Sequence, residues 1–113
     1  MCSQSDLIAI IKELAQAYRT TYGNAIDRII LYGSYARGSQ DEESDIDLAA
    51  IVHGDRNELQ KRLRKVWDIS DELELKYGII ISPTVVPYDE FMEYKKILPY
   101  YRNIEKEGVP IIA

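Results

Sequence analysis

Residues 28–52 read RIILYGSYARGSQDEESDIDLAAIV, and they predict two β-strands joined by a polar loop. Residues 28–32 are short, β-rich and almost wholly apolar, which is typical of a strand in the middle of a sheet. Gly33 ends this strand abruptly, and the residues after it have room for one short helix. Residues 38–44 are polar and acidic, which indicates a surface loop before the second strand.

The second strand, residues 45–52, is predicted to carry two different faces, because successive side chains of a strand point to opposite sides. Asp45 and Asp47 are two residues apart, so both carboxylates lie on one face, with their Cα atoms about 6–7 Å apart. Ala49 and Ile51 continue that face, and the opposite, wholly apolar face consists of Ile46, Leu48, Ala50 and Val52.

Helices are predicted on both sides of these strands. Over residues 6–22 apolar side chains recur at steps of three and four, with Ser5 or Asp6 as the N-cap and a glycine as the stop. A long second helix is predicted over residues 55–77, because Asp55 followed by Glu58 resembles a capping box and another glycine follows the last turn.

Residues 79–86 predict a third strand. Pro83 has no N–H to donate to a neighbouring strand, so this strand is expected at a sheet edge or with a bulge. Residues 89–98 and 99–106 predict two short closing helices, and residues 108–112 a final extended segment. The order predicts an α/β (α+β) fold with a small mixed sheet flanked by helices, and the length fits a single domain over residues 1–113.

Charge and cysteine content limit the partners and the compartment. The net charge is −5, whereas a surface that grips DNA or RNA is usually basic, so no direct nucleic-acid binding is expected. The apolar runs are too short for a membrane span, and the lone Cys2 excludes an internal disulfide, so we expect a cytoplasmic protein with no membrane contact. A basic patch on the long helix is either a solvated face or a contact for nucleic acid or an acidic partner; it consists of Lys61, Arg62, Arg64 and Lys65.

Two groups of side chains suit chemistry on a nucleotide. Carboxylates at the spacing of Asp45 and Asp47 repel each other unless a cation lies between them, and Mg²⁺ prefers such ligands and shares them with substrate phosphates. Gly33 lets the backbone approach a phosphate, Ser34 offers a hydroxyl, and Arg37 can add charge-assisted hydrogen bonds. We therefore expect the two aspartates to be metal ligands and catalytic residues, and the other three residues to bind the nucleotide.

Each feature alone has a simpler interpretation. An isolated Asp-x-Asp is most often a solvated strand end, and a lone Gly-Ser is weaker evidence still. An arginine such as Arg37, taken by itself, more often forms a surface salt bridge, here with Asp41, Glu42 or Glu43. The ordered set favours a site, because two carboxylates beside a hydrophobic core bring no evident structural benefit.

The sequence GSYARG at residues 33–38, followed by SDIDL at residues 44–48, resembles the signature of the DNA polymerase beta-like nucleotidyltransferase superfamily. More narrowly, it is similar to the minimal nucleotidyltransferases (the MNT group) of bacteria and archaea. The resemblance implies a nucleotidyltransferase fold, Mg²⁺ dependence, and transfer of a nucleoside monophosphate from ATP or another nucleoside triphosphate to a hydroxyl. It also implies a HEPN-domain toxin as partner, with this chain as an antitoxin that adenylylates the toxin, and a hetero-oligomer of the two.

The family pattern is incomplete on the predicted third strand. The superfamily usually supplies a third carboxylate there, whereas Ser82 and Thr84 stand in its place, and neither is a competent base near neutral pH. Glu42 and Glu43 in the loop are the alternative acids. Two other functions stay open. One is a degenerate binding module that neutralises a HEPN partner by contact alone; the other is transfer to a small molecule such as an aminoglycoside, which the lack of an acceptor-binding domain disfavours.

Overall fold

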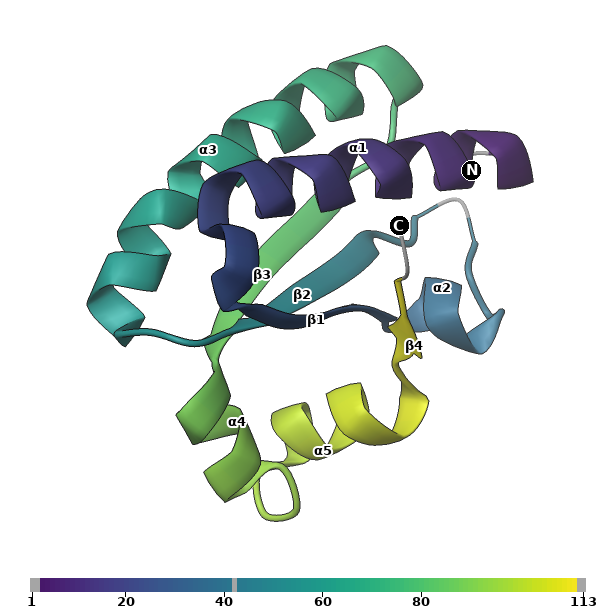
Figure 1. Cartoon of the computed structure of the whole chain (residues 1–113). Coiled ribbons are helices and arrows are strands. Elements are labelled where there is room, and N and C mark those ends of the chain that lie inside the picture. The colour runs from purple at the N-terminus through teal and green to yellow at the C-terminus, as the bar shows by residue number, and fades with distance from the viewer. Residues whose placement is uncertain (1–2, 42, 112–113) are drawn as a thin grey trace.

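A computed structural model describes residues 3–41 and 43–111, so Cys2 and Glu42 lie outside the described residues. Helices pack on both faces of a central sheet, as Figure 1 shows. The elements are α1 (Gln4–Tyr22), the 3₁₀-helix η1 (Gly23–Ala25), β1 (Ile26–Tyr32), α2 (Ser34–Arg37), β2 (Ile46–Val52), α3 (Arg56–Tyr77), β3 (Ile81–Pro87), α4 (Tyr88–Tyr94), α5 (Pro99–Glu107) and β4 (Val109–Pro110).

The sheet has the strand order β3-β2-β1-β4 and is mixed, as predicted. β1 runs antiparallel to both of its neighbours, whereas β2 and β3 are parallel and are joined by the crossover helix α3. β3 is an edge strand, which confirms the expectation drawn from Pro83. In the described part of the chain, no helix is both long and apolar enough to cross a membrane.

The two faces of β2 bury different sets of residues, because its side chains alternate as the sequence predicts. α1 and α3 cover one face of the sheet, and α4 and α5 cover the other (Figure 1). The first core takes the apolar face of β2, namely Ile46, Leu48, Ala50 and Val52. Ala49 and Ile51 enter a second core, which they share with Ile30, Val86, Phe91, Tyr101 and Ile104.

The ends of the long helices show which caps the sequence predicts correctly. Ser3, and not Ser5 or Asp6, caps α1, because its hydroxyl accepts the N–H of Asp6 at 3.1 Å and the helix starts at once after it. Asp55 caps α3 as predicted, with its carboxylate accepting from the N–H groups of Asn57 and Glu58. Orphan N–H groups of a first helical turn are thereby satisfied in both helices.

The open edge of β3 is closed by side chains of α3. Pro83 offers no N–H, and the N–H of Ile81 donates to the Glu74 carboxylate at 2.7 Å. The indole N–H of Trp67 donates to the Pro83 carbonyl at 3.2 Å. Trp67 lies at the sheet edge with its side chain half exposed, next to the buried stripe of α3. These contacts satisfy two backbone groups of the edge that an added strand would otherwise use.

Candidate functional site

The five predicted site residues come together where β1 ends and β2 begins. β1 and β2 are antiparallel neighbours, so the last residue of β1, Tyr32, pairs with Asp47 near the start of β2. Gly33 follows Tyr32 directly, and α2 begins at Ser34. A local pairing of two strands thus brings the glycine, the hydroxyl and the carboxylate to one end of the sheet.

Gly33 is required at its position for two physical reasons. Its backbone has φ 77° and ψ −156°, a conformation that is essentially restricted to glycine. A Cβ atom at this position would lie 2.4 Å from Oδ2 of Asp47, closer than any real side chain approaches. The Asp47 carboxylate therefore lies against the backbone of residue 33, and only glycine leaves room for it.

The helix after Gly33 is a single turn of 4 residues. The field at a helix terminus comes from aligned peptide dipoles, so one turn supplies little of it. Anion binding at this position would depend on the Ser34 hydroxyl and on individual backbone groups. The phosphate binding expected at this turn therefore rests on Gly33 and Ser34, and not on the terminus of a helix.

The two aspartates form an electrostatically unfavourable pair. Both side chains are half-buried, with Asp45 directly before β2 and Asp47 within it. Burial raises the pKa of the Asp47 carboxyl, the charge of Asp45 raises it further, and the Arg37 guanidinium opposes both effects. Like charges at this separation favour binding of a cation that neutralises them.

We expect the ionisation of Asp47 to destabilise the metal-free protein as the pH rises through the acidic range. A folded-state pKa above the unfolded value means that the folded protein holds the Asp47 proton more tightly, so the contribution of Asp47 to stability is fully present below its unfolded pKa and is lost as the pH rises through its folded pKa. Urea unfolding in a chelator between about pH 4 and pH 7 measures this, with Asp47→Asn as the comparison. The exposed Asp71→Asn on α3 is the control, and an equal pH profile for wild type and Asp47→Asn would contradict the assignment.

Arg37 is exposed and does not pair with Asp41 or Glu43 of the loop. Its Nη1 atom donates to Oε2 of Glu107 at 3.0 Å, across 70 positions of the chain. The sequence allowed a salt bridge between Arg37 and an acid of the loop that follows it. Among the described residues, Arg37 pairs with Glu107 instead. Arg37 still lies near enough to Asp47 for its charge to oppose the rise in the pKa of that carboxyl.

Two tyrosines that the sequence analysis did not assign to the site lie beside it. The hydroxyls of Tyr32 and Tyr100 are 2.8 Å apart, and their rings meet edge to face with centroids 5.9 Å apart. Burial, the hydrogen bond to Tyr100 and the charge of Asp47 raise the pKa of the Tyr32 phenol. Tyr32 could have been assigned to the site from the sequence, because it directly precedes Gly33. Tyr100 is far from the motif in the sequence, and no neighbouring residue links it to the site.

The third strand brings no acid to the two aspartates. Asp47 pairs with Ser82, and Ala49 pairs with Thr84, so both hydroxyl residues lie beside the aspartate face of β2. Within residues 3–41 and 43–111, no cluster of three or more His, Cys, Asp or Glu side chains is placed to hold a metal. Two carboxylates still fit Mg²⁺, because this ion is commonly held by one or two carboxylates and completes its shell with water and substrate phosphates.

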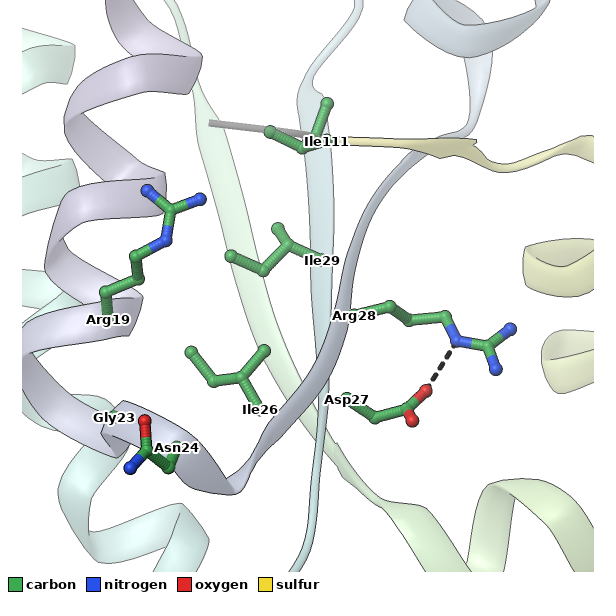
Figure 2. Close-up of a pocket in the computed structure, with 8 residues that line it drawn as sticks. All are labelled: Arg19, Gly23, Asn24, Ile26, Asp27, Arg28, Ile29 and Ile111. Atoms are coloured by element: carbon green, nitrogen blue, oxygen red, sulfur yellow. Dashed lines mark hydrogen bonds and ion pairs between the residues drawn. The ribbon is translucent and has the colours of Figure 1, made fainter.

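A pocket of about 490 Å³ lies at the other end of β1. Figure 2 shows Arg19 and Ile29 around it, with the ion pair between Arg28 and Asp27 to one side. None of the five candidate residues lines this pocket. The candidate site is thus separate from it, at the end of β1 that meets α2.

This arrangement is that of a nucleotidyltransferase. Residues 9–112 match the family described as "Nucleotidyltransferase domain", and the chain belongs to this family. Two relatives come from the archaeon Methanocaldococcus jannaschii. The protein named "Putative protein adenylyltransferase MJ0141" is 36% identical over 108 residues, which is 94% of this chain and 99% of the relative. "Putative protein adenylyltransferase MJ0604" is 39% identical over 98 residues, which is 87% of this chain and 90% of the relative.

Solved structures share the fold at lower sequence identity. A structure described as a "putative minimal nucleotidyltransferase" has a TM-score of 0.54 and 21% identity, and the match covers 97% of this chain and 100% of the other. A structure described as "the toxin-antitoxin with AMP-PNP" has a TM-score of 0.51 and 15% identity, and the match covers 96% of this chain and 72% of the other. The predicted nucleotidyltransferase fold is therefore confirmed.

Proposed function

We propose that the protein is a Mg²⁺-dependent nucleotidyltransferase that transfers AMP from ATP to a hydroxyl of a partner protein, and that residues 1–113 form one such domain. The observation that carries the proposal is the contact between Gly33 and Asp47. At one end of the sheet, the half-buried Asp47 carboxylate lies against the backbone turn that only Gly33 can adopt. Asp45 is two residues away in the sequence. This geometry has no benefit for the core and suits a phosphate held next to a cation.

The roles of the residues follow from their chemistry. Asp45 and Asp47 are proposed to hold Mg²⁺, which when bound neutralises charge on the phosphates. The backbone at Gly33 and the hydroxyl of Ser34 are proposed to hold the β- and γ-phosphates, and Arg37 to add charge-assisted hydrogen bonds. The acceptor oxygen then bonds to the α-phosphorus, pyrophosphate leaves, and the hydroxyl proton passes to solvent.

The acceptor is proposed to be a HEPN-type toxin, so that the chain serves as a cytoplasmic antitoxin within a hetero-oligomer. Relatives named as protein adenylyltransferases support a protein as the acceptor. A structural neighbour described as a toxin–antitoxin with AMP-PNP supports ATP as the donor and a toxin as the partner.

Mass spectrometry of the partner tests this function. The test incubates the product of the gene next to this one with the protein, ATP and Mg²⁺, and measures the intact mass of that product. We expect a gain of one or more AMP units, absent when Mg²⁺ is chelated. An unchanged partner mass, with ATP still present and the two proteins bound to each other, would contradict transfer.

A second function is favoured by one observation, the Ser82 hydroxyl at the β3 position next to Asp47. Without a third carboxylate the acceptor has no further acid to bind or activate it. The chain would then be a binding module that retains the nucleotidyltransferase fold and neutralises its partner by contact alone. The same mass measurement separates the two functions, since the module leaves the partner unmodified in a stable complex.

A further inference from the structure

The guanidinium of Arg37 is already engaged by an anion of the same chain. Nη1 of Arg37 and Oε2 of Glu107 are 3.0 Å apart, and both side chains are about half exposed. Glu107 is the last residue of α5, while Arg37 is the last residue of α2 beside the candidate phosphate site. The contact therefore places the Glu107 carboxylate on the guanidinium that we propose binds the nucleotide.

Glu107 is held near Arg37 by the packing of α5. Tyr101 and Ile104 are buried in the second core and fix the helix against the sheet. Directly after Glu107, a Cβ atom on Gly108 would lie 2.2 Å from Cγ2 of Ile30, so the backbone here rests on β1. The core thus fixes the backbone at Glu107, so the start of its side chain lies near Arg37 whether or not the ion pair forms.

We propose that Glu107 competes with the nucleotide phosphates for Arg37, an inference that rests on the proposed function. Carboxylate and phosphate oxygens bind a guanidinium through the same kind of charge-assisted hydrogen bond. Glu107 also adds a negative charge beside the place where a triphosphate would lie. Orientation of Arg37 by Glu107 would work in the opposite direction, but a triphosphate must then displace Glu107 or lie beside its negative charge, and either lowers the affinity for ATP. Competition therefore outweighs orientation, and nucleotide binding exchanges one anion for another.

Glu107→Gln tests this by changing the affinity for ATP. We expect the dissociation constant for ATP with Mg²⁺, measured by calorimetry at low salt, to fall by about two- to fivefold, the factor that corresponds to an exposed ion pair. The matched control is Glu105→Gln, which removes the same charge from α5 but from a pair with Lys95. The dissociation constant of the Glu105→Gln control for ATP is expected to lie closer to that of the wild type. The difference in this constant between the two variants is expected to shrink at high salt.

A double-mutant cycle with Arg37 identifies the route of the effect. In an Arg37→Gln background, the difference in ATP affinity between Glu107→Gln and Glu105→Gln is expected to shrink to what the charge of Glu107 alone contributes, because no guanidinium remains to compete for. Equal or weaker ATP binding by Glu107→Gln than by Glu105→Gln in the presence of Arg37 would overturn the competition while the nucleotide site stands. Absence of ATP binding by the wild-type protein would instead remove the proposed function, and this inference with it.

Discussion

Replacing Asp45 and Asp47 together by asparagine is expected to abolish nucleotidyl transfer and to leave the protein folded. Asparagine keeps the size of both side chains but removes the charges that would hold Mg²⁺ next to the triphosphate. Loss of several kcal/mol of transition-state stabilisation corresponds to a fall in rate of about 10³-fold or more. Folding is expected to be unchanged or slightly improved, because the pKa of Asp47 is raised by burial and by Asp45.

Transfer of labelled nucleotide measures the first part of this result, and urea unfolding in a chelator measures the second. The matched control is Asp71→Asn, which removes a charge from the exposed side of α3. It is expected to leave both quantities unchanged. Labelled product from the double variant at near wild-type rate would remove the two aspartates from the chemistry.

Gly33→Ala is expected to have the second largest effect, on both stability and ATP binding. The backbone conformation at φ 77° costs a residue with a side chain about 1–3 kcal/mol. The new methyl group would also collide with Oδ2 of Asp47, 2.4 Å away, and must displace that carboxylate. We expect unfolding free energy to fall by about 3 kcal/mol in total and ATP affinity to fall at least tenfold.

Gly78→Ala is the comparison for a glycine of positive φ whose added methyl group meets no neighbour. Gly78 ends α3 with φ 67°, and no atom lies within 4 Å of the Cβ that alanine would add. This variant should lose only the backbone contribution of about 1 kcal/mol and should bind ATP as the wild type does. If Gly33→Ala lost no more stability than Gly78→Ala and bound ATP equally well, the close approach to Asp47 would have no functional role.

The strands and long helices could be predicted because their signals are local. The apolar alternation of residues 45–52 and the helical spacing of residues 6–22 each predict an element within a few residues of its observed bounds. Trp67 shows where such a pattern fails. Its spacing on α3 matches the core stripe, yet its indole N–H donates to Pro83 at the sheet edge. Helical periodicity specifies a direction from the helix axis but not which neighbour lies there.

Sequence alone identified the family motif and the candidate residues Gly33, Ser34, Arg37, Asp45 and Asp47. These residues lie within one short segment that joins two paired strands, so local patterns were enough to group them. Tertiary structure decided what surrounds them. Ser82 lies next to Asp47 only because α3 returns the chain to a parallel edge strand. Tyr100 reaches Tyr32 across 68 positions, and Glu107 reaches Arg37 across 70, once the second core has fixed α5 under the sheet. Contacts at such separations depend on packing of the whole fold, which no local pattern of residues encodes.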